Sequence, residues 1–112
     1  GEEFKEELER LEVYMNTQKP FLSDSLTLQN LAEQIDIPEK QLSYLINREM
    51  GQHFFDYINS FRIKEAQSLL LNSDLNVQEI MYDVGFNSKS SFNTAFKKHT
   101  STTPTAFRKS NS

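Results

Sequence analysis

The sequence predicts an all-α protein of about seven helices, arranged as two helix-turn-helix subdomains that a long linker helix joins. The main observation is an internal repeat, in which apolar and polar positions of residues 28–57 recur 49 or 50 residues later. A second observation is that no stretch alternates apolar and polar residues with period two, so no sheet is expected. The repeated pairs are Leu28 and Val77, Leu31 and Ile80, Ala32 and Met81, Ile35 and Val84, Ile37 and Phe86, Leu42 and Phe92, Ile46 and Phe96, Arg48 and Lys98, Gly51 and Ser101, and Tyr57 and Phe107.

An amphipathic helix and a connection are expected over residues 1–22. Apolar residues with a 4-3-4 spacing place this helix between Glu2 and about Thr17, and Pro20 ends it. The apolar residues are Phe4, Leu8, Leu11 and Met15.

The first helix-turn-helix is expected over residues 23–53. Thr27 can cap its first helix, and Pro38 suits the first turn of its second helix. The second helix carries an apolar stripe and should stop near Gly51. That stripe is Leu42, Leu45 and Ile46.

The linker helix is expected over residues 54–72, and the second helix-turn-helix with a C-terminal helix over residues 73–112. Asn76 and Glu79 form a plausible capping box, and Gly85 can supply a positive φ in the following turn. Asn87 or Ser88 should cap the next helix, and the Thr103-Pro104 pair should open the last one. The linker residues expected to face inward are Phe54, Tyr57, Ile58, Phe61, Ala66, Leu69 and Leu70.

Two helix-turn-helix units on one chain imply two helices presented to one partner, and duplex DNA fits this geometry best. A linker of about 18 residues rises roughly 27 Å. A straight linker would therefore hold the two second helices about one DNA turn apart, roughly 34 Å.

The charge distribution is uneven. The net charge of −4 and the pI near 5.1 oppose a nucleic-acid partner. Residues 1–42, however, hold ten acidic and four basic side chains, whereas residues 43–112 hold six acidic and eight basic ones. The acidic residues gather between Glu2 and Glu12, a segment that can point away from a polyanion.

Several classes of function are disfavoured. The chain has no Cys, and His53 and His99 are isolated, so we expect neither a metal site nor another cofactor. No nucleophile-elbow or phosphate-loop motif is present, so we expect no catalytic residues. No apolar stretch could span a membrane, so we expect no membrane contact and a cytoplasmic location. A start at Gly1 rather than Met indicates a piece of a longer protein.

From about Leu28 to Arg108 the chain resembles the DNA-binding domain of the arabinose-regulator (AraC/XylS) family of transcription factors. The resemblance is carried by Leu31-Ala32, Tyr57-Ile58-Asn59, Arg62-Ile63, Ala66, Leu69-Leu70, Ile80, Val84-Gly85-Phe86-Asn87-Ser88, Ser91-Phe92, Phe96-Lys97-Lys98, Thr103-Pro104 and Phe107-Arg108. Residues 54–59 and 87–92 resemble the Bacteroidetes branch of this family.

The resemblance implies that the second helix of each unit is a recognition helix. In the first unit, the resemblance implies that Lys40, Ser43 and Tyr44 face bases and that Asn47 lies nearer the backbone. Arg48 is a further candidate for a DNA contact. In the second unit, the implied DNA-binding residues are Lys89, Ser90, Ser91, Asn93, Thr94 and Lys97, of which Ser91 and Lys97 should lie near phosphates.

The chain departs from the family pattern at four positions. Met81 replaces a small residue, and Ser101 replaces a Gly. Tyr44 and Thr94 stand where many relatives carry Arg, so base readout should depend more on DNA shape, methyl contacts and water.

Some residues have two interpretations. Tyr44 is either a core aromatic or an exposed ring that stacks on a base edge or sugar; the filled apolar stripe favours the exposed ring. Arg48 either contacts phosphate or pairs with a carboxylate, Glu49 or Asp56, and the two are equally favoured. Arg62 and Arg108 are expected to hold carboxylates or helix ends within the fold.

We therefore expect a sequence-specific DNA-binding domain of a bacterial transcription regulator, which binds double-stranded DNA and pairs with a second copy or with a fused sensor or effector domain. The alternative is a helical protein–protein interaction module that docks through its acidic N-terminal helix. A non-specific architectural DNA binder is disfavoured by the small number of Lys and Arg residues.

Overall fold

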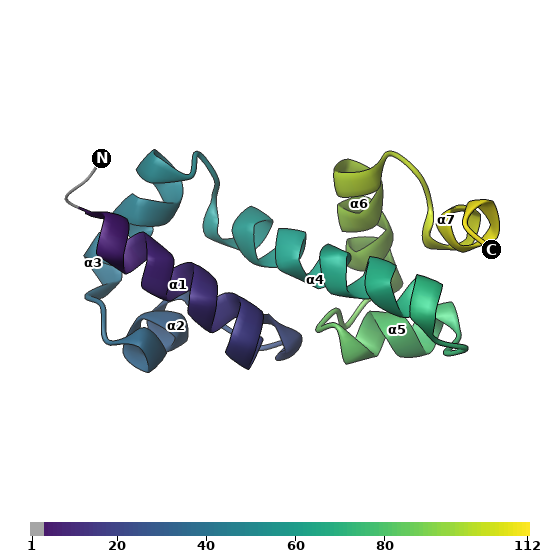
Figure 1. Ribbon diagram of the computed structural model, residues 1–112, viewed down its shortest axis with the longest axis horizontal. Coiled ribbons are helices and arrows are strands. Elements are labelled where there is room, and N and C mark those ends of the chain that lie inside the picture. The colour runs from purple at the N-terminus through teal and green to yellow at the C-terminus, as the bar shows by residue number, and fades with distance from the viewer. Residues whose placement is uncertain (1–3) are drawn as a thin grey trace. The chain divides into compact units, whose positions relative to one another are not determined.

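The computed structural model describes residues 4–112, and within this range the chain contains seven α-helices and no strand (Figure 1). A 3-10 turn, Pro20–Leu22, follows the first helix, and a π-helical stretch, Leu45–Glu49, directly follows the third. The predicted all-α fold with two helix-turn-helix subdomains is confirmed. The helices are α1 Lys5–Gln18, α2 Leu28–Ile35, α3 Glu39–Tyr44, α4 Phe54–Asn72, α5 Val77–Asp83, α6 Lys89–Thr100 and α7 Pro104–Ser110.

The chain divides into two compact units. The first unit comprises the described residues up to Phe21 together with Ser25–Ile58, and the second comprises Leu22–Asp24 and Asn59–Ser112. Helix α4 therefore contributes its first turn to the first unit and the rest of its length to the second.

In the first unit, α1 lies against α2, and α2 lies against α3 (Figure 1). Leu11 and Met15 of α1 are fully buried, as their spacing predicts. The helix begins at Lys5; the predicted start at Glu2 lies outside the described residues. It ends at Gln18 because the next residue, Lys19, is left-handed with φ 49°.

Polar contacts also connect α1 to α2. The Arg10 guanidinium donates to the backbone carbonyl of Ile35, which is the last residue of α2. The Tyr14 hydroxyl donates to Gln34 Oε1 over 2.6 Å. Since carbonyls at a helix C-terminus have no partner within the helix, Arg10 satisfies a group that would otherwise depend on water.

The predicted starts of α2, α5, α6 and α7 are confirmed, because each capping side chain accepts from a backbone N–H of the first turn. Thr27 Oγ1 accepts from Asn30 N over 3.0 Å, and Ser88, rather than Asn87, caps α6. The predicted capping box is complete: Asn76 accepts from Glu79 N over 2.8 Å, and the Glu79 carboxylate accepts from Asn76 N over 3.2 Å. Pro38, predicted in the first turn of α3, is instead the residue before the helix, which begins at Glu39 without a side-chain cap.

The second helix of the first unit differs from the prediction of one regular helix up to Gly51. After Tyr44 the helix widens, and Met50 N donates to the carbonyl of Leu45, five residues back, over 3.1 Å. Gly51 follows with φ 66°, the left-handed conformation expected of the stop. The π-helical turn rotates later side chains relative to an α-helix, so the direction of Arg48 does not follow from a spacing of 3.6 residues.

The core of the second unit centres on stacked phenylalanine rings. Phe92 lies between Phe86 and Phe96, with ring centroids 5.3 and 5.9 Å away, and Phe107 of α7 continues the stack 5.8 Å from Phe96. These tilted and edge-to-face arrangements are favourable for aromatic pairs. Through this stack the α5–α6 turn and α7 pack against one face of α6. The opposite face of α6 is exposed.

Two arginines donate to backbone carbonyls in the second unit, and for Arg108 these lie at a helix end, as expected. Arg108 donates to the carbonyls of Leu70, over 3.1 Å, and Ser73, over 3.2 Å, at the C-terminal end of α4. Arg62 is buried, donates to the carbonyl of Ser23 over 2.8 Å, and lies 5.5 Å from the centroid of the Phe86 ring. Burial lowers the pKa of Arg62, and the charge of Asp24 opposes this shift.

The residues of α4 that are buried agree only in part with those predicted to face inward. Tyr57, Ile58, Ala66 and Leu70 are buried, whereas the remaining predicted residues, Phe54, Phe61 and Leu69, are only half-buried. Ile63 and Arg62 are buried although they were not among the residues expected inward. The reason is that α4 contributes to two cores, so its apolar residues do not follow a single stripe.

Candidate nucleic-acid interface

The first candidate surface is the polar side of α3 and the π-helical stretch that follows it. Their apolar side is fully buried at Leu42, Leu45 and Ile46, which orients the opposite side toward solvent. The predicted residues lie there: Lys40, Asn47 and Arg48 are exposed, Tyr44 is 47 % exposed, and Ser43 is half-buried.

Two contacts organise this first surface. Asn47 Nδ2 donates to Ser43 Oγ over 3.1 Å, so these side chains share one side of the helix in spite of the π-helical turn. The Tyr44 ring packs against the Phe4 ring, at the start of α1, with centroids 5.5 Å apart. Tyr44 is therefore exposed rather than a core aromatic, and its stacking on a base edge or sugar stays a prediction.

The second candidate surface is the exposed face of α6. Phe92, Ala95 and Phe96 point into the core. All six predicted residues of this helix, Lys89, Ser90, Ser91, Asn93, Thr94 and Lys97, are exposed.

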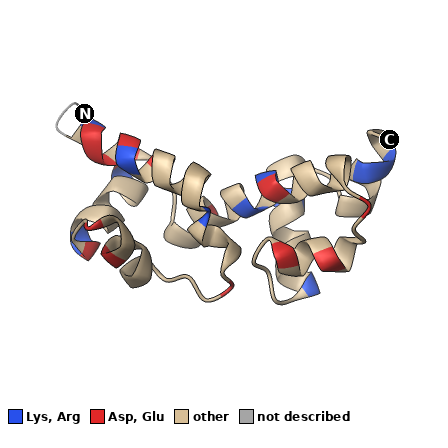
Figure 2. Ribbon diagram, turned by 60° about the horizontal axis from the view of Figure 1, so that its bottom comes forward, with Lys and Arg blue, Asp and Glu red and all other residues tan. Residues whose placement is uncertain are grey.

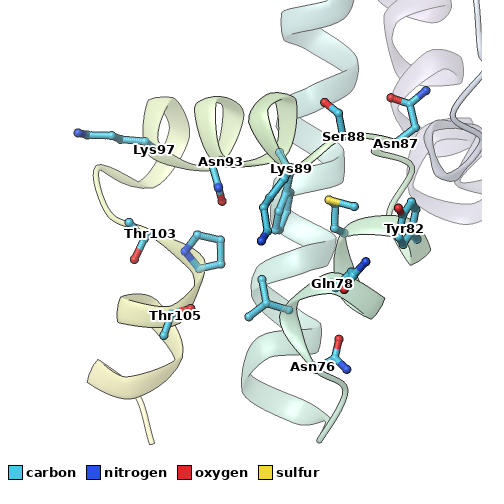
Figure 3. A pocket seen from close by; sticks show the side chains of 14 residues that line it. Asn76, Gln78, Tyr82, Asn87, Ser88, Lys89, Asn93, Lys97, Thr103 and Thr105 are labelled. Atoms are coloured by element: carbon cyan, nitrogen blue, oxygen red, sulfur yellow. The ribbon is translucent and has the colours of Figure 1, made fainter.

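Three of these residues, Lys89, Asn93 and Lys97, follow one another at intervals of four and form one row along the helix. This row lines a cleft of about 840 Å³ between α5, α6 and the start of α7 (Figure 3). Apolar side chains, Met81 among them, also line the cleft, whereas Ser90, Ser91 and Thr94 do not. Only 4 % of the Met81 surface is exposed, so this side chain also belongs to the core of the second unit.

The cleft adds polar residues that the sequence did not single out. Gln78 of α5 and Thr105 of α7 line it together with the row on α6 (Figure 3). Both are exposed and carry neutral hydrogen-bonding groups. In the sequence, only their polar character indicated a place in the site, and many other surface residues share that character.

The charge of the two surfaces differs. Helix α6 carries Lys89, Lys97 and Lys98 and no carboxylate, whereas α3 with its π-helical extension carries two acidic and two basic residues. Acidic residues also occupy the first turn of α1, Glu6 and Glu7. Figure 2 shows Asp and Glu in red and Lys and Arg in blue along the chain. Of the two candidate surfaces, α6 therefore carries the net positive charge that favours a polyanion.

Within residues 4–112, no group of three or more His, Asp or Glu side chains is arranged to hold a metal ion. No helix in the same part of the chain combines the length and the apolar character that a membrane crossing requires.

An all-α chain with two capped helix-turn-helix units, each exposing the polar side of its second helix, defines the class of helix-turn-helix proteins. A family model described as a helix-turn-helix domain matches residues 31–110. The chain therefore belongs to this family, and its relatives and structural neighbours place it in the AraC type, among the DNA-binding domains of transcriptional regulators.

Similar proteins include the transcriptional activator RhaR of Cronobacter sakazakii, which is 30 % identical over 100 residues, covering 89 % of this chain and 35 % of RhaR. GlxA of Rhizobium meliloti, named a transcriptional regulator, is 33 % identical over 79 residues, or 70 % of this chain and 24 % of that protein. The chain thus spans about a third or less of the length of these curated relatives.

Among solved structures, the C-terminal domain of AraT, a response regulator from Geobacillus stearothermophilus, is 33 % identical with a TM-score of 0.77. The alignment covers 91 % of this chain and 83 % of that one. The DNA-binding domain of AdpA, solved with a target DNA, shares the fold at 20 % identity and a TM-score of 0.74, over 92 % of this chain and 89 % of that one.

Proposed function

We propose that this domain binds double-stranded DNA in a sequence-specific manner, with α3 and its extension in one major groove and α6 in the next. The observation that carries the proposal is the exposed row of Lys89, Asn93 and Lys97 on a helix without carboxylates. The two lysines can bind phosphates, and the Asn93 amide can form hydrogen bonds with base edges in the major groove.

The remaining predicted residues have proposed roles of the same kind. Short polar side chains on the exposed face of α6, Ser90, Ser91 and Thr94, suit close approach to the sugar–phosphate strand and base edges. On the first surface we assign base-edge contacts to Lys40, Ser43 and Tyr44, and backbone contacts to Asn47 and Arg48. With so few cations, sequence-independent affinity should be low, and discrimination should depend on direct contacts and DNA shape.

A selection from a random-sequence duplex library tests the proposal. The selected duplexes should contain two short motifs with centres about 10 bp apart, one for each recognition helix. Binding to such a duplex should weaken steeply with salt, and each phosphate contact should add about 0.9 to the slope of log K against log salt.

Matched variants then test the second surface. Lys89→Ala and Asn93→Ala should weaken binding to the selected duplex while the thermal unfolding midpoint stays unchanged. Lys64→Ala, which also removes one exposed positive charge, is the control and should bind nearly as the parent does. Equal affinity of all these variants would refute the assignment of α6, and failure to enrich any sequence would refute specific DNA binding.

We also propose that a signal-receiving domain or a second copy of the chain controls this activity. AraT supports the proposal, because it is a response regulator whose C-terminal domain resembles this chain. A second copy on repeated sites would compensate for a weak single-domain affinity. A chain that acts on bacterial chromosomal DNA in this way works in the cytoplasm.

A further inference from the structure

The first recognition surface includes a contact from outside its helix-turn-helix unit. Phe4 immediately precedes α1, and its ring lies 5.5 Å from the Tyr44 ring at an interplanar angle of 53°. Both residues belong to the same compact unit. Phe4 lies outside residues 31–110, the segment that matches the helix-turn-helix family model.

Tyr44 needs such a contact because the core does not hold it. Its neighbours in sequence differ: Leu45 is fully buried, whereas 47 % of Tyr44 is exposed. An exposed tyrosine on a helix exchanges between rotamers, and ordering it on binding costs free energy. A tilted aromatic pair lowers that cost by favouring one ring orientation before the ligand arrives.

We propose that Phe4 is a positioning residue, which holds the Tyr44 ring in the orientation that meets DNA in the first major groove. The inference depends on the proposed DNA-binding function. Phe4 supports one side of the ring, and the exposed remainder presents an apolar face and a hydroxyl to a base edge or a deoxyribose. The same contact makes base preference at the first motif sensitive to the position of α1.

The opposite effect of the same contact is occlusion, in which Phe4 covers Tyr44 and DNA has to displace it. The two effects predict opposite signs. If Phe4 positions the ring, its removal weakens binding; if it occludes the ring, its removal strengthens binding.

A double-mutant cycle tests the proposal with the 112-residue chain and a fluorescent duplex selected from a random-sequence library. Phe4→Ala should weaken binding about three- to ten-fold, the range expected when one side chain loses its preorganisation. In the Tyr44→Ala background, Phe4→Ala should have no further effect. Phe4→Tyr, which keeps the ring, should restore the affinity of the parent.

The base preferences measured at the two motifs separate a positioning role of Phe4 from a structural role. The base preference at the first motif should broaden in Phe4→Ala, while the preference at the second motif stays as in the parent. Val13→Ala is the control, because Val13 is a 60 % exposed apolar residue elsewhere on α1 and should change neither quantity.

Unchanged affinity in Phe4→Ala, tighter binding, or an equal loss in both backgrounds would each overturn the proposal. Failure of the proposed function has a separate signature, since the parent chain would then bind no selected duplex and Lys89→Ala would have nothing to weaken.

Discussion

Truncation of Phe92 to alanine should destabilise the second unit strongly and leave the chemistry of the recognition face unchanged. Only 1 % of the Phe92 surface is exposed, and its ring lies between those of Phe86 and Phe96. Its neighbour Asn93 is exposed, although both residues contribute to the lining of the cleft. One helix therefore provides adjacent positions with opposite expected effects.

The magnitude follows from burial and geometry. Truncation of a buried phenylalanine to alanine costs about 3–5 kcal/mol, and the cost is larger where the surroundings cannot collapse into the cavity. Phe92 has ring partners at 5.3 and 5.9 Å, and each aromatic pair adds about 0.5–1.5 kcal/mol beyond area burial. We therefore expect a value near the upper end, about 5 kcal/mol, which is a large part of the 5–15 kcal/mol typical of a domain.

Urea denaturation followed by far-UV circular dichroism measures this loss as a lower unfolding midpoint. Phe92→Leu should lower the free energy of unfolding less than Phe92→Ala does, because leucine keeps most of the apolar volume. Asn93→Ala should keep the midpoint of the parent and lose DNA affinity. A loss below about 1.5 kcal/mol for Phe92→Ala would refute the packing argument, because it matches a volume-conserving core substitution.

Three further predictions concern single positions. Ser101→Gly should stabilise the chain by about 0.5–1 kcal/mol in thermal unfolding, because Ser101 has φ 63° and only glycine adopts this conformation without strain; Ser101→Ala should give no gain. Asn76→Ala should cost about 1 kcal/mol, because it removes the side chain that caps α5, and an unchanged midpoint would contradict the capping box. Burial, and secondarily the charge of Glu12, raise the pKa of Tyr57 above the ordinary value near 10, so the protonated phenol is favoured in the folded chain. Its contribution to stability should be complete below about pH 10 and decline as the pH rises further; Tyr57→Phe should show a smaller decline in alkaline denaturation.

The exposure of the candidate residues on α6 was predictable from the sequence, because α6 is a regular helix and follows helical periodicity. Phe92 and Phe96 lie on the apolar side of α6, and residues such as Asn93 and Lys97 must then face away from it. The same reasoning predicted the exposed Tyr44, because the apolar stripe next to it is complete without it.

The cleft next to α6 could not be predicted in this way. Gln78 and Thr105 meet there from two helices that are 27 positions apart, and nothing in either local sequence distinguishes them from other exposed polar residues. The π-helical turn after Tyr44 was also missed, since the sequence from Leu45 to Glu49 reads as ordinary amphipathic helix.

Helix boundaries were determined by the sequence itself, because a cap such as Thr27 or Asn76 bonds to a backbone group only three residues away. The interactions that tertiary structure decided join residues far apart: Arg62 reaches a carbonyl 39 positions earlier in the chain, and Phe4 meets Tyr44 across 40 positions. The physical reason is the separation along the chain of the groups that interact. A cap requires only a local backbone conformation, whereas these contacts exist only after the helices have packed and brought distant side chains together.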